Sequence, residues 1–503
     1  MKESVVKMSL LTALASVSFV ASAQYRTDLA AEDAPKTDVG AVLEKAESSD
    51  TPVVITLEQA LEIALSENVA VKVSDMEIKR TEYAKRGSYA SLFPQIDASG
   101  MYQRTIKKQV MYMDFDMSSI MGGGLPGGIP GEGGTENPSA PDTQAPSKED
   151  SSGGGLEVGR WNTWSAGLSA SMPLVNAQLW RSLRISGLDV ELAVEKARSS
   201  RLDMVTQVKN AYFGTLMAKE AFNVYKEVYE NAMKNYEETQ KKFSSQKASE
   251  MDVLRAKTSV ANAIPNVYNA ESSVILALWQ LKAVLGVELD MNIDVAGCLE
   301  DYSHQMFYDI HQHDSISVDH NTTMKQLAIQ AEQLAENIKI QQYANIPSLA
   351  MMFNFSMNAM TNDFNFSEYK WTPYSYVGFS LNIPIFAGGK RYHQIRQARN
   401  QYEQVKLQTV NTERQLKIAI RQSLNTMETN MKSYYAAKDA VAAAQKGYDI
   451  TSMAYQVGRS TLVELNDAQL ALTQARLAES QAIYNFVTAK AQLEQTIGQD
   501  FIN

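Results

Sequence analysis

The sequence has a single cysteine, Cys298, among its 503 residues. One thiol cannot form a disulfide within the chain, so a disulfide-stapled fold is excluded. Because Cys298 lies far from the amino terminus, we also expect no lipid-modified leading cysteine. Beyond residue 23 the chain has no run of about 18 apolar residues, the minimum for a membrane-spanning helix. Any crossing of a bilayer would therefore be made by strands of alternating polarity.

The chain also lacks the motifs of common catalytic sites. It has no phosphate-binding glycine-rich loop, no His-Glu-x-x-His motif and no Gly-x-Ser-x-Gly turn. The isolated Ser244-x-x-Lys247 pattern lies at a predicted turn and has no companion motif. A net charge of -10 disfavours binding to nucleic acid. We therefore expect a protein that is not an enzyme, holds no cofactor and binds no nucleic acid.

Two groups of side chains could be read as metal ligands, and we interpret both as ordinary surface residues. Thioethers suit a soft ion such as Cu(I), and His-x-His spacing can bind a transition metal. Neither group has a defined helix face on which its members would converge, so we predict no metal site. The groups are Met111, Met113, Met117 and Met121, and His304, His311, His313 and His320.

The first 23 residues have the layout of a cleaved secretory signal. A basic start is followed by an apolar run over 8–21 and by Ala21-Ser22-Ala23 before Gln24. A transmembrane anchor is the alternative, but the run is too short and lacks a stop-transfer pattern. We therefore predict export, with a mature chain that begins at Gln24 and an extended segment over 24–55.

The rest of the chain repeats itself. Gly167-Leu-Ser-Ala-Ser-Met-Pro-Leu-Val recurs as Gly378-Phe-Ser-Leu-Asn-Ile-Pro-Ile-Phe, at an offset of 211. Residues 252–286 align without a gap with residues 464–498, at an offset of 212. Duplication is the simplest cause, so we divide the chain into a first repeat over 56–320 and a second over 321–503.

Long helical hairpins are predicted in both repeats. Apolar residues alternate at spacings of three and four from Val253 to Val284 and again in the second repeat, where Glu479 is the one exception. This period of about 3.5 residues is typical of a coiled-coil seam. The preceding segments, 177–243 and 389–455, contain no proline and predict rods of about 100 Å each. An ordinary globular bundle is the alternative, and Pro265 is expected to kink or break its helix.

Each repeat also opens with a shorter helix that ends at a proline. The first is predicted from a capping box at Thr56 to Pro94, and the second from about Thr322 to Pro347. Residues 287–320 form the linker between the repeats. A strand is expected to follow each of these two prolines.

Four segments alternate in polarity with period two: 95–106, 160–174, 348–358 and 373–386. Aromatic residues of the first, second and fourth segments gather at the same end, as in the interfacial girdle of a membrane barrel; they are Tyr102, Trp161, Trp164, Trp371, Tyr374 and Tyr376. A soluble sheet is the alternative. Four strands cannot close a barrel, since about eight is the smallest number that can, so copies of the chain must combine. Residues 107–159, rich in glycine and proline, are predicted to be a disordered or mobile outer loop.

Together these features resemble the TolC-like outer membrane efflux protein family, over essentially the whole mature chain. The most specific match is Tyr455-Gln-Val-Gly458-Arg-Ser-Thr461-Leu-Val-Glu464-Leu-Asn-Asp467, which resembles the family's periplasmic hairpin tip. The resemblance implies an α+β membrane protein of the outer membrane, with duplicated long helical hairpins forming a periplasmic α-barrel. It also implies that four strands per chain contribute to a shared transmembrane β-barrel and that the chain forms a homotrimer. Its partners would be a periplasmic adaptor protein, an inner-membrane transporter and the outer-membrane lipid bilayer.

The resemblance also assigns the site residues. The adaptor-docking tip would comprise Val457, Gly458, Arg459, Ser460 and Thr461, with Ser245 and Gln246 at the first tip. Because the first tip has no glycine, we expect a different turn geometry there. The channel constriction would comprise Glu464, Asp467, Tyr455 and Asp252, and the family's gate arginine falls on Ser460. A ring of carboxylates in a narrow pore favours cations and responds to pH and divalent ions; a solvated helix face is the alternative.

We therefore predict an exit duct that carries small toxic compounds, or secreted polypeptide, from an inner-membrane pump to the exterior. The alternatives are a structural or adhesive coiled-coil envelope protein and an adaptor-like periplasmic coiled coil. Neither alternative needs paired strands with aromatic ends.

Overall fold

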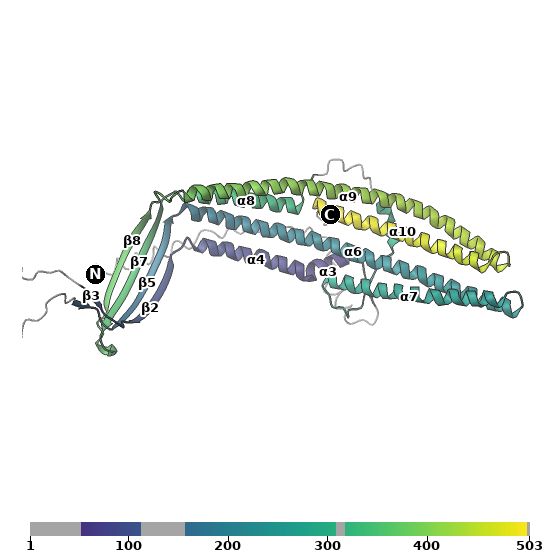
Figure 1. The fold of residues 1–503 in the computed structure, drawn as a ribbon, viewed down its shortest axis with the longest axis horizontal. Coiled ribbons are helices and arrows are strands. Elements are labelled where there is room, and N and C mark those ends of the chain that lie inside the picture. The colour runs from purple at the N-terminus through teal and green to yellow at the C-terminus, as the bar shows by residue number, and fades with distance from the viewer. Residues whose placement is uncertain (1–51, 112–155, 308–316, 500–503) are drawn as a thin grey trace, which may run out of the picture.

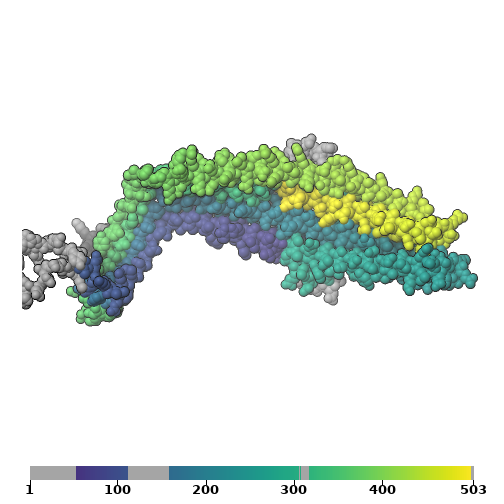
Figure 2. All heavy atoms as spheres, viewed as in Figure 1, coloured from purple at the N-terminus to yellow at the C-terminus, as the bar shows by residue number. Residues whose placement is uncertain are grey.

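The computed structural model describes residues 52–111, 156–307 and 317–499. The predicted signal peptide, nearly all of segment 24–55 and most of loop 107–159 lie outside these ranges, as do His311 and His313. The described chain is a long, curved rod with a sheet at one end and two helical hairpin tips at the other (Figures 1 and 2). None of the helices in these ranges is both long enough and apolar enough to cross a membrane.

The sheet confirms the four predicted strands. It has the antiparallel order β2-β5-β7-β8, and no other described strand pairs with the outer edges of β2 and β8. The strands are β2 (Gln95–Arg104), β5 (Asn162–Val175), β7 (Ser348–Thr361) and β8 (Thr372–Asn382). A second ribbon pairs β3 (Gln109–Met111) with β4 (Leu156–Val158), so the expected outer loop begins and ends in regular structure. Those strands were missed because three residues are too few to show a period of two.

The strand register places the aromatic residues of the sheet on two different faces. Tyr102 lies directly opposite Trp164, with ring centroids 4.3 Å apart, on the face that also carries the apolar residues. Tyr374 and Tyr376 project from the other face, because side chains alternate along a strand. The predicted gathering at one end of the sheet is confirmed for Tyr102 and Trp164, whereas Tyr376 lies midway along β8. Neither Tyr374 nor Tyr376 belongs to an apolar girdle.

The long helices are confirmed, and they run the length of the rod (Figure 1). One expectation about the other helices was wrong, and of the kink or break expected at Pro265 the break does not occur. The helix predicted from Thr56 to Pro94 is divided at Asn68, whose side-chain oxygen accepts a hydrogen bond from the Ala70 amide (2.7 Å) and starts a new helix. The helix with Pro265 is continuous through that residue, so proline does not break it. The helices are α3 (Leu57–Glu67), α4 (Val69–Ala90), α6 (Ala177–Ser244), α7 (Glu250–Leu285), α8 (Thr322–Tyr343), α9 (Lys390–Gln456) and α10 (Leu462–Ile497).

The two return helices are packed unequally although their sequences align. Helix α7 packs on α6 through the predicted alanine seam, in which Ala256, Ala263 and Ala270 are buried. Helix α10 packs on both α9 and α6, and is therefore buried along two stripes. In Figure 2, α7 forms one margin of the tip half and α9 the other. Within the described part of a single chain, the outer face of α7 has no partner.

Halfway along the rod, the linker between the repeats builds a small core that the sequence did not predict. Strand β1 (Val53–Ile55) pairs in parallel with β6 (Ile293–Val295), and the 3₁₀ helix η1 (Leu299–Phe307) packs on α10. The buried Tyr212 of α6 donates a hydrogen bond of 2.8 Å to the carbonyl of Ala296. This ties the linker to the longest helix of the first repeat.

Two equivalent joints connect the short helices to the return helices. The side-chain amide of Asn68 donates to the carbonyl of Val284, and that of Asn321 donates to the carbonyl of Thr496, both at 2.7 Å. The next turn ends each return helix at a left-handed glycine, Gly286 with φ 79° and Gly498 with φ 76°. A Cβ on Gly286 would lie 2.8 Å from the Cα of Asn68, so these glycines are required by contact as well as by conformation.

Glu479 is the one acidic residue in the α10 seam, where the first repeat has Val267. Burial raises the pKa of its carboxyl, and Glu300 of η1 and Glu220 of α6 add to the rise, against Lys438 of α9 and Arg476 of α10. An acid with a raised folded-state pKa loses folded-state stability as pH rises through the window between its ordinary and raised values.

We therefore expect Glu479→Val to stabilise the protein by about 1 kcal/mol near neutral pH, because a half-buried charge is replaced by a side chain that packs. The gain should shrink below the ordinary pKa of glutamate, where the native carboxyl is neutral. Thermal unfolding at both pH values measures it, with the exposed Glu271→Val as control. A variant that is less stable at neutral pH would show that the carboxylate is well accommodated.

Candidate functional site

The predicted docking and gating residues lie at the two hairpin tips, at the end of the rod farthest from the sheet (Figure 1). In the second tip, α9 ends at Gln456, Gly458 adopts φ 81°, and the Arg459 amide donates to the carbonyl of Ala454 at 2.8 Å. The first tip has the same turn. Its Gln246 adopts φ 57°, and the Lys247 amide donates to the carbonyl of Lys242 at 2.8 Å.

The expectation of a different turn at the first tip was therefore wrong. Gln246 accepts the left-handed conformation that Gly458 adopts without cost, because the flanking helices and the closing hydrogen bond determine the backbone. The described chain has no other non-glycine residue with positive φ. The first tip therefore carries local strain that the second does not.

Two of the predicted constriction acids start the return helices. Asp252 accepts hydrogen bonds from the Ser249 amide (3.1 Å) and hydroxyl (2.7 Å), and the Ser249 hydroxyl caps α7 in return. Glu464 accepts from the Thr461 amide (2.8 Å) and the Ser460 hydroxyl (2.5 Å) at the start of α10. These are capping boxes.

The same hydrogen bonds lower the pKa values of both acids. The Ser460 hydroxyl, then the Thr461 amide, lowers the pKa of Glu464, and Ser249 lowers that of Asp252. A lowered pKa keeps each carboxylate charged to a lower pH than usual. Each of these two carboxylates therefore becomes protonated only at a pH further below neutrality than is usual for its residue type.

Tyr455 joins the two hairpins. Its side chain is buried, its hydroxyl lies 2.6 Å from the Thr239 hydroxyl, and its carbonyl accepts a hydrogen bond of 2.8 Å from the Lys242 ammonium. The same ammonium lies 4.3 Å from the centre of the Tyr455 ring. We call Thr239, Lys242 and Tyr455 the tip latch, because it links the last turns of α6 to the last turn of α9.

The latch was only partly foreseen. Sequence reasoning placed Tyr455 and Asp252 in one constriction without assigning their contacts, and the Asp252 carboxylate bonds to Ser249. Thr239 and Lys242 were missed, because they belong to the other hairpin and no motif in the sequence pairs them with Tyr455. A buried Thr239 opposite a tyrosine becomes visible only once α6 and α9 are placed together.

The remaining predicted residues lie on the surface of the tips. Val457 is 71% exposed at the apex, and Arg459 and Ser245 are also exposed. Asp467 is exposed and makes no hydrogen bond or ion pair within the described ranges. It is thus the constriction candidate whose carboxylate is unused by the fold of a single chain.

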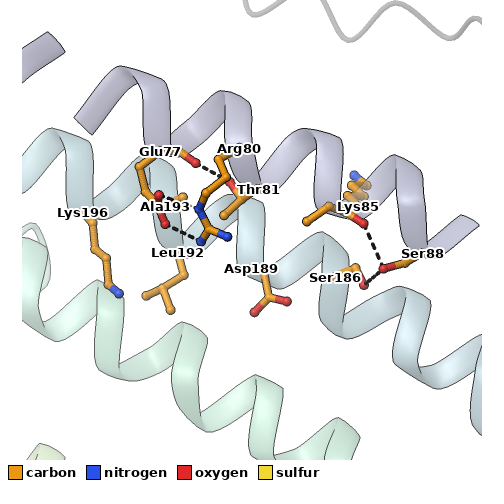
Figure 3. Close-up of a pocket in the computed structure, with 11 residues that line it drawn as sticks. Glu77, Arg80, Thr81, Lys85, Ser88, Ser186, Asp189, Leu192, Ala193 and Lys196 are labelled. Carbon is orange, nitrogen blue, oxygen red and sulfur yellow. Dashed lines mark hydrogen bonds and ion pairs between the residues drawn. The ribbon is translucent and has the colours of Figure 1, made fainter. Parts of the chain in front are cut away.

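A separate groove of about 340 Å³ lies between α4 and α6 (Figure 3). Its charged groups are largely engaged: Arg80 forms an ion pair with Glu77 at 2.6 Å, and Asp189 accepts a hydrogen bond from Gln333 at 2.8 Å. No cluster of potential metal ligands occurs in the residues that the structure describes. The tips are therefore the better candidate site.

Long paired helices with exposed tips, joined to a sheet with one apolar face, define the subunit of a channel that extends from a membrane. The family model "Outer membrane efflux protein" matches residues 60–287 and 316–499, and the chain belongs to this family.

Known proteins of two kinds are similar to the chain. Outer membrane protein TolC of Escherichia coli is 21% identical over 352 residues, which cover 67% of this chain and 70% of TolC. Alkaline protease secretion protein AprF of Pseudomonas aeruginosa is 21% identical over 344 residues, which cover 66% of this chain and 69% of AprF. The Campylobacter jejuni CmeC outer membrane channel has the same fold, with a TM-score of 0.64 at 17% identity, covering 88% of this chain and 85% of CmeC.

The protein is thus an outer membrane channel for efflux or secretion, with a long helical extension into the periplasm. The family is one of transport channels rather than enzymes. The alternative of an adhesive or structural coiled-coil envelope protein is not favoured.

Proposed function

We propose that three copies of this chain form one exit duct, in which the sheets close a shared twelve-stranded barrel and the helices close a periplasmic tunnel. The observation that carries this proposal is that a single chain leaves both structures open. Strands β2 and β8 have free edges, and unpaired edge groups in a membrane need a partner. Four strands are fewer than the about eight that a barrel requires.

The outer face of α7 supports the same assembly. By the offset of 212, this face corresponds to the stripe of α10 that packs on α6. The buried α10 residues Ser480, Val487 and Ala491 correspond to Tyr268, Ile275 and Trp279, which are 66%, 44% and 49% exposed. Because α9 is the repeat equivalent of α6, α9 of the next copy is the expected partner of this face. The contact of α10 with α6 within one chain is thus the model for the contact of α7 with α9 of the next copy.

At the far end, we place the adaptor-docking surface at Val457, Gly458, Arg459, Ser460 and Thr461, with Ser245 and Gln246 of the first tip. Equal turn geometry supports this, since one kind of partner hairpin can approach both tips. The partner is a periplasmic adaptor that links the duct to an inner-membrane transporter. The cargo is small toxic compounds or secreted polypeptide.

The constriction is assigned to Asp467 and Glu464, with Asp252 and the Tyr455 latch restraining the tips. Six carboxylates from three copies would repel one another by a few kcal/mol at about 4 to 6 Å in partly screened surroundings. The latch and the capping boxes oppose that repulsion in each chain.

We expect Glu464→Gln with Asp467→Asn to raise single-channel conductance in planar bilayers and to weaken block by divalent cations several-fold, because the ring loses its charge. The amides keep the capping geometry that alanine would remove at Glu464. Glu250→Gln serves as the control, because Glu250 is an exposed acid in the first turn of α7 that is assigned to neither the constriction nor the latch. Unchanged conductance and block in the double variant would show that no such ring lines the pore.

Two experiments with the full processed chain test the assembly and the partner. A trimer in detergent that conducts ions is expected, and a water-soluble monomer would contradict the exit duct. A photo-crosslinker at Val457 in cells should capture an adaptor. A pump-linked adaptor would indicate efflux of small compounds, and a secretion adaptor would indicate protein export.

A further inference from the structure

The polar face of the four-stranded sheet has an unusual charge distribution. Along β2, β5, β7 and β8, the register divides the side chains into an apolar set, with Leu168, Phe355 and Phe379, and a polar set. The polar set consists mainly of serine, asparagine, glycine and tyrosine. Among these strand residues Asp97 is the one charged side chain of the polar face, and no lysine or arginine lies there. The face therefore carries a net negative charge in each chain.

The same face presents two aromatic rings. Tyr374 and Tyr376 are 62% and 45% exposed, and their ring centroids lie 5.7 Å apart. Their hydroxyls have no hydrogen-bond partner within the described ranges. The residues directly opposite on β7 are Ser356 and Asn354, which are too small to cover the rings. Both ring faces and hydroxyls are thus available to a ligand.

The acid and one ring lie in a single row across the sheet. Asp97 lies opposite Ser169, Ser169 opposite Asn354, and Asn354 opposite Tyr376. Three strand spacings separate the ends of this row by about 14 Å, and both end side chains project from the same face. Both side chains stand roughly perpendicular to the sheet, so a small cation stacked on the ring contacts Tyr376 directly and is attracted to Asp97 across the row.

We propose that this row binds aromatic organic cations as they leave the duct, with the ring of the cargo against Tyr376 and Tyr374 and its cationic group toward Asp97. This inference rests on the proposed assembly, in which the polar face lines the pore. Tyrosine faces attract cations and stack on aromatic rings. The absence of basic residues on this face disfavours anions of the same shape.

Three probes test the proposal in planar bilayers, added on the side of the sheet. Benzyltrimethylammonium carries a ring and a positive charge, tetramethylammonium carries the charge alone, and benzenesulfonate carries a ring and a negative charge. We expect benzyltrimethylammonium to block the current at the lowest concentration. Tyr376→Ala should raise its half-blocking concentration about three- to tenfold, while Tyr376→Phe should keep it near the native value because the ring remains.

Asp97→Asn should weaken block by both cations, whereas Ser99→Ala, on the same face of β2, should leave it unchanged. Equal block by benzenesulfonate, or unchanged block in both the Tyr376→Ala and Asp97→Asn variants, would overturn the proposal. A channel that conducts with unaltered block refutes this site alone. A chain that forms no channel refutes the exit duct. In that case, titration calorimetry of benzyltrimethylammonium into the detergent-solubilised protein tests the row itself, and an absence of binding would overturn the proposal.

Discussion

A Gly498→Ala variant should lose about 3 kcal/mol of stability, the largest loss we expect from any single methyl group in the described chain. Gly498 has φ 76°, a conformation that costs an alanine about 1–2 kcal/mol. Its Cβ would also lie 2.9 Å from the carbonyl carbon of His320 and closer still to the oxygen. The backbone of the α8–α10 joint would have to move, which breaks the bond between Asn321 and Thr496.

Thermal unfolding of the detergent-solubilised protein measures the loss, and the chain offers a matched control. Gly458 has φ 81°, but no atom lies within 4 Å of where its Cβ would be. Gly458→Ala should therefore cost only the conformational part, about 1–2 kcal/mol. Equal losses in the two variants would mean that the close approach at the joint contributes nothing.

Removal of the Lys242 ammonium should open the tips. In Lys242→Met, α9 loses a charged hydrogen bond to the Tyr455 carbonyl and a cation–ring contact, together about 2–3 kcal/mol. The carbonyl lies in the last turn of α9, where the helix dipole favours a positive charge. Because these contacts are made only while the hairpins are together, the ratio of closed to open channels falls by about 30-fold or more.

Single-channel conductance and open probability measure this change, and both should rise in Lys242→Met. Lys241→Met is the matched control, because Lys241 is the adjacent, exposed lysine and makes no contact with Tyr455. Tyr455→Phe, which removes only the bond to Thr239, should have a smaller effect. The latch is refuted if Lys242→Met and Lys241→Met behave alike.

The regular part of the fold could be read from the sequence because it is periodic. Strand alternation over 348–358 and the alanine seam of α7 each follow from local side-chain patterns, and both are confirmed. Short elements such as β1 and β6 carry no period, and their pairing joins residues more than 200 positions apart. The turn at Gln246 was wrongly expected to differ, because backbone context overrode the residue's own preference.

For the candidate site too, local sequence patterns identified residues, whereas their contacts became known only from the structure. The sequence located the tips and named Tyr455, Asp252, Glu464 and Asp467, but it could not assign their contacts. Two of the acids cap helices.

By itself, the sequence determined the repeat, through matching segments at offsets of 211 and 212 residues. It also determined the long amphipathic helices, the alternating strands and the position of the tips, because each of these is encoded in spacings of a few residues. Only the tertiary structure decided which faces meet. It placed Lys242 on Tyr455, packed α10 on both α9 and α6 but α7 mainly on α6, and put Asp97 in a row with Tyr376. The physical reason is that equal sequence patterns acquire unequal surroundings when the two repeats pack together. The return helix α10 is covered on two sides, whereas the outer face of its repeat equivalent α7 stays exposed.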